Sequence, residues 1–177
     1  METTSVPDGV VTERGTFAFE RNRATLAEVT AHLRDADSQF QPPLSTRVDL
    51  AAYAAKLLAR AERFEARAAD RLVGLVAAYC NQSPTAFVTS VSVLSPWRGH
   101  GIARILMEQC LAEARRRGAA RIELEVDRGA TAALNLYRRL GFAAPDGDLP
   151  AATAGPGPST PVRLCLTLEP QPTDRPQ

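Results

Sequence analysis

The stretch that decides the fold is Val91-Ser92-Val93-Leu94-Ser95-Pro96-Trp97-Arg98-Gly99-His100-Gly101-Ile102-Ala103. It begins in a run rich in Val, Thr and Phe, which is typical of a strand, and it ends where apolar residues take up helical spacing. The first amides of a helix have no intrahelical partner, and with the helix dipole they form an anion site. Gly99 and Gly101 let the backbone approach a bound group, Ala103 is small, and Arg98 adds a positive charge. The segment therefore predicts a phosphate-binding loop.

Two other phosphate loops do not fit this segment. A Walker A loop would continue with Gly-Lys-Ser/Thr, and a dinucleotide-binding fingerprint would need a third glycine. By itself, the pattern Arg-Gly-x-Gly-x-Ala also fits an ordinary turn into a helix. The residues around the loop must therefore decide between the two readings.

The rest of the chain alternates between strand and helix patterns. Strands are predicted at Thr16–Glu20, Phe64–Ala69, Leu72–Cys80, Ala86–Leu94, Arg121–Asp127, from Phe142, and at Val162–Leu168, and helices at Thr25–Asp37, Asp49–Ala61, Ile102–Gly118 and Thr131–Leu140. Three successive strands with short turns favour an antiparallel meander, and the β-α-β unit that follows should be parallel and right-handed. We therefore predict a three-layer α+β fold, with a mixed, mostly antiparallel sheet of six to seven strands and helices on both faces.

Length and composition indicate one domain. The 177 residues are 45% hydrophobic and 23% charged, which is ordinary for a globular domain. We expect that domain over residues 15–169, with a flexible N-terminal arm over 1–14 and a flexible C-terminal tail over 170–177. The net charge of +1 argues against a nucleic-acid partner.

Cysteine and histidine usage argues against a metal site. The chain has three cysteines without a Cys-x-x-Cys pair and two histidines, of which His32 is expected on the surface of the first helix. No signal peptide and no apolar run near ~20 residues is present, so we expect a cytoplasmic protein without a membrane partner. Lys56 is the only lysine among 21 basic residues, a bias that suggests a GC-rich bacterium.

Two motifs together resemble one family. Arg98-x-x-Gly101-x-Ala103, between a strand and an amphipathic helix, resembles the acetyl-CoA signature Gln/Arg-x-x-Gly-x-Gly/Ala of the GCN5-related N-acetyltransferases (GNAT). The segment Asn135–Phe142 resembles the Leu-Tyr-x-x-x-Gly-Phe block of the same family. The resemblance is close from Leu72 to Phe142, and outside that range it rests on the order of elements. Ala130 departs from the family, because many members carry an asparagine there that contacts the cofactor.

The resemblance implies acetyl-CoA as co-substrate and no metal. It implies that one set of residues holds the pyrophosphate: Arg98, Gly99, His100, Gly101, Ile102 and Ala103. It also implies that Val91, Ser92 and Val93 lie along the pantetheine arm, where a backbone amide would polarise the thioester carbonyl as an oxyanion hole does.

Two side chains are candidates for proton transfer. Tyr137 is the candidate acid, because a phenol with a pKa near ~10 can protonate a thiolate whose thiol has a pKa near ~8.5; the alternative is that it only packs in the core. Glu125 is the candidate base, because several relatives use a glutamate in this Leu-Glu-Val position, and an alkyl amine with a pKa near ~10.4 needs help to lose its proton. The alternative for Glu125 and Glu123 is a salt bridge or a solvent-facing position.

These inferences predict an N-acetyltransferase that moves an acetyl group from acetyl-CoA to a primary amine of a small molecule, by direct attack in a ternary complex. The alternatives are an acyl-CoA-binding sensor or non-catalytic module, and acetylation of a protein or peptide amine. The acceptor side is expected from the first two helices and the Asp146–Pro161 loop. A homodimer is an open alternative to a monomer.

Overall fold

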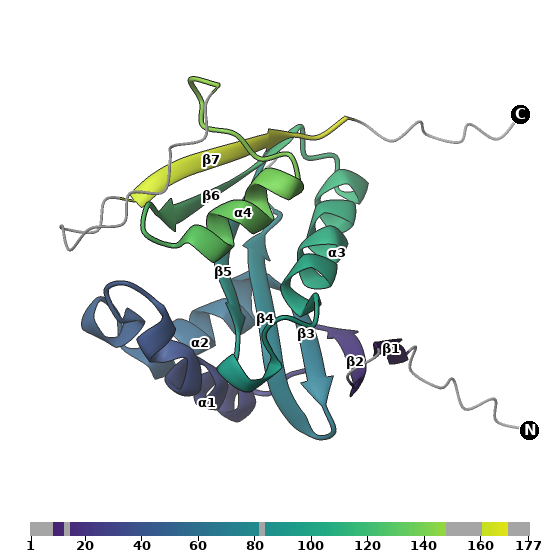
Figure 1. Cartoon of the computed structure of the whole chain (residues 1–177), viewed down its shortest axis with the longest axis vertical. Coiled ribbons are helices and arrows are strands. Elements are labelled where there is room, and N and C mark those ends of the chain that lie inside the picture. The colour runs from purple at the N-terminus through teal and green to yellow at the C-terminus, as the bar shows by residue number, and fades with distance from the viewer. Residues whose placement is uncertain (1–8, 13–14, 82–83, 148–160, 170–177) are drawn as a thin grey trace, which may run out of the picture. The chain divides into compact units, whose positions relative to one another are not determined.

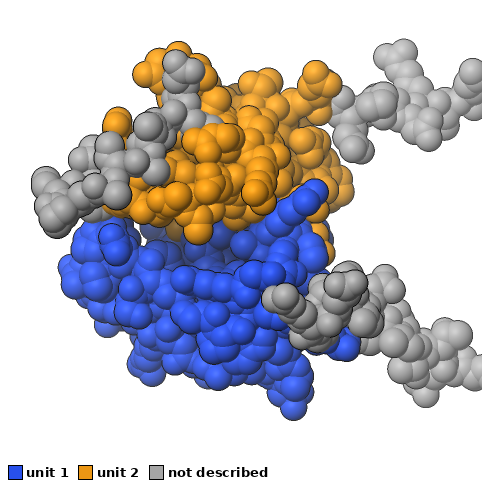
Figure 2. Space-filling view, in the orientation of Figure 1, with its two compact units in different colours: residues 1–77, 90–107 blue, residues 78–89, 108–177 orange. Residues whose placement is uncertain are grey.

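The structure is a computed structural model that describes residues 9–12, 15–81, 84–147 and 161–169. It divides into two compact units, which Figure 2 colours separately. Unit 1 comprises residues 1–77 and 90–107, and unit 2 comprises residues 78–89 and 108–177. Strands β4 (Arg71–Tyr79) and β5 (Thr85–Val93) and helix α3 (Ile102–Arg116) each contribute residues to both units.

The strands follow chain order in the sheet, from β1 to β7 (Figure 1). Besides β4 and β5 they are β1 (Gly9–Thr12), β2 (Gly15–Arg21), β3 (Glu62–Ala68), β6 (Arg121–Asp127) and β7 (Pro161–Thr167). The pairs β1–β2, β2–β3 and β6–β7 are antiparallel, and β5–β6 is parallel. This confirms the predicted mixed sheet and its β-α-β unit. Strand β1 was not foreseen, since it lies in the segment expected to be an arm.

In unit 1, helix starts are fixed by side-chain caps that the sequence predicts. Helix α1 (Leu26–Ala36) begins with a capping box, in which Thr25 Oγ1 accepts the Glu28 N–H at 3.3 Å and Glu28 Oε2 accepts the Thr25 N–H at 2.8 Å. Helix α2 (Leu50–Arg60) begins at Asp49, whose carboxylate accepts the Ala52 N–H at 2.7 Å. The two helices pack against each other, and the short 3₁₀ helices η1 (Asp37–Gln39) and η2 (Leu44–Thr46) lie between them in sequence.

A buried carboxylate joins the entry of α1 to the sheet in unit 1. Glu65 on β3 is 0% exposed and accepts the backbone N–H groups of Arg23 and Ala24 at 2.9 and 2.8 Å. Arg63 Nε lies 3.3 Å from the same carboxylate. A charge this deep is tolerated because it is paired and hydrogen-bonded, so these contacts hold α1 at a fixed place on the sheet.

The start of α3 packs closely on β4 in unit 1. An added Cβ at Gly74 would lie 2.7 Å from Ile102 Cγ2 and 3.2 Å from Leu106 Cδ1, so only glycine admits the helix at this distance. Figure 1 shows the α1–α2 pair on one side of β4 and α3 on the other. The predicted arrangement of helices on both faces is therefore confirmed.

In unit 2, β6 shows the predicted alternation. Ile122, Leu124 and Val126 are buried, while Glu123 and Glu125 point to the other face. Helix α4 (Thr131–Arg139) follows β6. The strand predicted from Phe142 is not formed among the described residues; in its place a single antiparallel bridge pairs Ala143 with Cys165.

Most of the predicted Asp146–Pro161 loop and the C-terminal tail lie outside the described residues. Within the described part of the chain, every helix is too short or too polar to cross a bilayer.

Candidate functional site

The predicted phosphate loop has the backbone geometry of an anion site. The 3₁₀ helix η3 (Ser95–Trp97) leads into Gly99 and Gly101, which have positive φ angles of 78° and 76°. The first α3 hydrogen bond runs from the Ile105 N–H to the Gly101 carbonyl at 3.1 Å, so the amides of Ile102 and Ala103 have no acceptor within the helix. A Cβ added at either glycine would meet nothing within 4 Å, so open space lies beside the loop.

Side chains hold this loop from within unit 1. Arg98 Nε donates to the Val93 carbonyl at 3.1 Å, and Arg98 Nη2 donates to Gln39 Oε1 on η1. A guanidinium has five N–H donors, so others remain for an anion. His100 Nδ1 lies 3.1 Å from the Trp97 carbonyl oxygen and 3.0 Å from the Arg98 carbonyl oxygen. The His100 ring packs edge-on against Phe17, with the two ring centroids 5.6 Å apart. The imidazole therefore donates from Nδ1 and stabilises the turn.

The end of β5 leads directly into the loop. The described ladder with β6 runs from Thr85–Arg121 to Val88–Leu124, and β5 continues to Val93. Val91–Val93, the residues predicted for the pantetheine arm, therefore lie past the last described β5–β6 pair. Directly after them, the Leu94 N–H donates to the Val73 carbonyl at 2.9 Å, which ties this end of the strand to β4.

His32 is not on the surface, and our prediction for it was wrong. It is 2% exposed; its Nδ1 lies 3.1 Å from the Leu72 carbonyl and its Nε2 lies 2.8 Å from Ser92 Oγ. A carbonyl can only accept, so Nδ1 carries the proton and Nε2 accepts the Ser92 hydroxyl. Burial lowers the pKa of the imidazole below its usual value. The missed signal was its spacing, because Val29, His32 and Ala36 share the buried face of α1.

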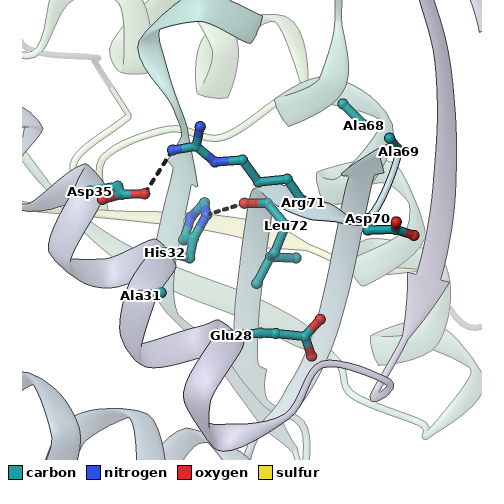
Figure 3. Close-up of a pocket in the computed structure, with 9 residues that line it drawn as sticks. All are labelled: Glu28, Ala31, His32, Asp35, Ala68, Ala69, Asp70, Arg71 and Leu72. Atoms are coloured by element: carbon teal, nitrogen blue, oxygen red, sulfur yellow. Dashed lines mark hydrogen bonds and ion pairs between the residues drawn. The ribbon is translucent and has the colours of Figure 1, made fainter.

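A hollow of about 470 Å³ lies beside His32 in unit 1 (Figure 3). Its volume lies in the range of small-molecule sites. It is lined by α1 and the β3–β4 turn, through Glu28, Ala31, His32, Asp35, Ala68, Ala69, Asp70, Arg71 and Leu72. Two of its carboxylates are already paired: Arg67 lies 2.7 Å from Glu28, whose pKa it lowers to about 2, and Arg71 lies 2.8 Å from Asp35. No hollow was predicted at this place.

Tyr137 lies inside unit 2 with its ring packed. It is 5% exposed, and its ring meets Phe142 edge-on with centroids 5.8 Å apart. Burial raises the pKa of its hydroxyl well above the usual value, because the phenolate would be poorly solvated. The two alternatives from the sequence are therefore compatible: the ring belongs to the core, and the hydroxyl stays protonated as an acid requires.

Glu125 lies in a more solvent-exposed environment of unit 2. Its side chain is 48% exposed, and Arg163 Nη2 on β7 lies 2.9 Å from its carboxylate. That hydrogen bond raises the pKa of the Arg163 guanidinium. Glu123 is 14% exposed, with Arg121 at 3.1 Å and Arg163 at 3.5 Å. Both carboxylates thus occupy ion pairs, and the role of Glu125 as base stays a prediction.

Comparisons with known proteins identify the family and the fold. A family model for the acetyltransferase (GNAT) family matches residues 27–142. No curated protein matches the sequence.

Several solved structures have the same fold. A putative acetyltransferase from Salmonella typhimurium, solved with acetyl-CoA, is 18% identical, with a TM-score of 0.65 over 87% of this chain and 96% of that chain. An acetyltransferase from Bacillus subtilis in complex with CoA is 22% identical, with a TM-score of 0.63 over 86% and 99%. The ribosomal-protein-S18-alanine N-acetyltransferase from Escherichia coli is 18% identical, with a TM-score of 0.61 over 90% and 99%.

Proposed function

The chain belongs to the GNAT family of acetyltransferases, which use acetyl-CoA, and from this premise we propose that it acetylates a primary amine of a small molecule by direct attack in a ternary complex. The observation that carries the proposal is the loop Arg98–Ala103, where two glycines with positive φ lie beside open space at the start of α3.

The loop supplies the groups that a pyrophosphate requires. The amides of Ile102 and Ala103 and the dipole of a 15-residue helix favour an anion at this end of α3. Arg98 has further N–H donors besides those that contact Val93 and Gln39. Acetyl-CoA supplies an activated acetyl thioester when it is bound. We assign Val91–Val93 to its pantetheine arm, where a backbone N–H past the β5–β6 ladder would stabilise negative charge on the carbonyl oxygen.

Proton transfer is assigned to two side chains of unit 2. The amine must lose one proton as its nitrogen bonds to the acetyl carbon, and the departing sulfur must gain one. Tyr137 is suited to give a proton, because burial keeps its hydroxyl protonated. Glu125 is suited to receive one directly or through water, because its carboxylate is paired with Arg163 and its side chain is 48% exposed.

An amine panel with free CoA as the readout tests the proposal. The panel contains amino sugars, polyamines and amino acids, together with peptides that begin with alanine. We expect CoA release with at least one small amine, and a rise in melting temperature with acetyl-CoA alone. The proposal is refuted if no amine causes CoA release and millimolar acetyl-CoA causes no shift in melting temperature.

Acetylation of a protein N-terminus is the second candidate. It is favoured by the structural likeness to an enzyme that acetylates an alanine of ribosomal protein S18. Turnover of the peptides with no turnover of any small amine would select this candidate.

A further inference from the structure

One face of α1 and η1 contacts the segments of unit 1 that lead to the phosphate loop. Its members His32, Asp35 and Gln39 are spaced by three and four residues, the spacing of one helix face. We call this set the α1 seam. His32 contacts Ser92 on β5, and Gln39 contacts Arg98 in the loop.

Asp35, in the middle of the seam, is connected to Trp97 before the loop through Arg71. Asp35 Oδ2 lies 2.8 Å from Arg71 Nη2, an ion pair that Figure 3 marks with a dashed line. The Arg71 guanidinium lies 5.1 Å from the ring centroid of Trp97 on η3. The α1 seam therefore contacts the region from the end of β5 to the phosphate loop at three positions.

The His32 contact is buried, whereas the contacts of Asp35 and Gln39 are exposed. The Asp35 and Arg71 side chains are 48% and 56% exposed, and exposed ion pairs contribute little because water screens them. His32 and Ser92 are 2% and 6% exposed, and a buried hydrogen bond is costly to leave unmade. His32 also donates to the Leu72 carbonyl, so a single ring fixes the end of β5 against β4.

We propose that His32 is a positioning residue for acetyl transfer: through Ser92 it holds the end of β5, Val91–Val93, in the place where the acetyl-CoA arm binds, and it does so fully only while its imidazole is neutral. This inference rests on the proposed function for the assignment of Val91–Val93. Protonation of Nε2 would reverse the Ser92 hydrogen bond and leave a cation in a buried site, so acid favours states in which the ring leaves its place.

The charged groups around His32 do not offset its burial. Asp35 on its own helix favours the protonated ring and Arg71 on β4 opposes it. Glu28 of α1 and Asp70 of the β3–β4 turn also line the hollow beside the ring, and Glu28 is paired with Arg67. Burial remains the largest influence and lowers the pKa from 6.5. Between the lowered pKa and 6.5 the unfolded chain binds more protons than the folded chain. The stability that the contact contributes is therefore complete above pH 6.5 and is lost as the pH falls through the lowered pKa.

Two measurements that need no amine substrate test the proposal. They are the affinity for acetyl-CoA by calorimetry and the hydrogen exchange of the Val91–Val93 amides, each from pH 5 to pH 8. His32→Leu removes the contact, and Ser92→Ala removes its other partner. His32→Gln keeps a neutral side chain that reaches toward Ser92 but cannot titrate. Ser90→Ala is the matched control, because Ser90 is 5% exposed on the same face of β5 and its hydroxyl has no hydrogen-bond partner among the described residues.

We expect His32→Leu and Ser92→Ala each to weaken acetyl-CoA binding about fivefold at neutral pH and to speed exchange at Val91–Val93. The double variant should bind acetyl-CoA no more weakly than the single variant with the lower affinity, because each substitution removes the same contact. In the wild type, binding should weaken as the pH falls through the lowered pKa of His32, and His32→Gln should lack this part of the pH profile. Ser90→Ala should behave as the wild type.

The proposal is overturned if His32→Leu binds acetyl-CoA as Ser90→Ala does and exchange at Val91–Val93 is unchanged. If His32→Leu does not fold, the difference in pH profile between the wild type and His32→Gln decides, and identical profiles overturn it. Failure of the proposed function looks different. Acetyl-CoA binding without turnover of any amine refutes the function alone, and the exchange experiment, which needs no ligand, still reports on His32.

Discussion

The phosphate loop of unit 1 and the Tyr137 and Glu125 positions of unit 2 are functional candidates of different kinds. The loop is a candidate because of its backbone: two positive φ angles, a helix start and open space next to both glycines. Tyr137 and Glu125 are candidates because of their side chains, whose properties depend on their surroundings. These surroundings differ sharply, with Tyr137 5% exposed and the Glu125 side chain 48% exposed. The comparison teaches that a backbone site follows from residue type and spacing, whereas a side-chain role depends on burial and partners.

The largest effect is expected at Tyr137. Tyr137→Phe keeps the ring on Phe142 and removes only the hydroxyl. Turnover should fall about 10²–10⁴-fold with little change in acetyl-CoA affinity, since a general acid acts in the transition state. Because burial raises the pKa of the Tyr137 hydroxyl, this group should stay protonated up to pH 10, and the wild type should lose no activity through its deprotonation in that range. Steady-state kinetics together with single-turnover measurements check this, and unchanged chemistry would leave Tyr137 as a packing residue.

Glu125 is expected to give the next largest effect. Glu125→Gln should lower activity at least about tenfold at neutral pH, and the loss should shrink at higher pH, where more of the amine is already neutral. Stability should hardly change, because the pair with Arg163 is exposed. The measurement is a pH–rate profile beside that of Glu123→Gln, which removes the neighbouring carboxylate of the same face. If Glu123→Gln shows the pH-dependent loss instead, the base is Glu123, and equal loss at all pH values would indicate damage to the fold.

Gly101 tests the backbone site directly. Gly101→Val forces a β-branched residue into φ of 76° and should weaken acetyl-CoA binding about tenfold, because the turn and its amides must shift. Gly118→Val is the matched control, with φ of 78° and likewise no neighbour within 4 Å of an added Cβ. Calorimetry should show weaker binding for the first variant alone. Equal binding by both would mean that the geometry of the loop does not matter for the cofactor.

An effect on stability alone is expected where α3 meets β4. Gly74→Ala places a Cβ 2.7 Å from Ile102 Cγ2 and should lower the free energy of unfolding by about 1–3 kcal/mol. Adding Ile102→Ala removes that methyl group and should restore part of the loss, which urea denaturation can measure. If Gly74→Ala alone is as stable as the wild type, the close approach does not constrain the start of the helix.

Some elements followed from the sequence because local chemistry determines them. Thr25 and Glu28 formed the predicted capping box and Asp49 the predicted cap, since each satisfies amides within three residues of itself. The alternation from Arg121 to Asp127 gave β6 with its apolar side buried. The turn into α3 at Arg98–Ala103 also followed from the sequence, because glycine readily adopts the positive φ angles found at Gly99 and Gly101.

Other features depended on segments far apart in the chain. Gly9–Thr12 forms a strand only because β2 is available to pair with it. His32 is a polar residue that a helix pattern assigns to solvent, and it is buried because Leu72 and Ser92, 40 and 60 residues away in sequence, satisfy both ring nitrogens. Glu125 acquires Arg163 from a strand 38 residues later.

The sequence by itself determined most of the helices and strands, the glycine turn before α3 and the family, since these rest on short-range periodicity, turn chemistry and motif spacing. Only the tertiary structure decided which polar groups are buried, which carboxylates are paired and which acids stay protonated. Solvation and charge pairing act through space, so their partners lie in elements that the sequence lists far apart and the fold brings together.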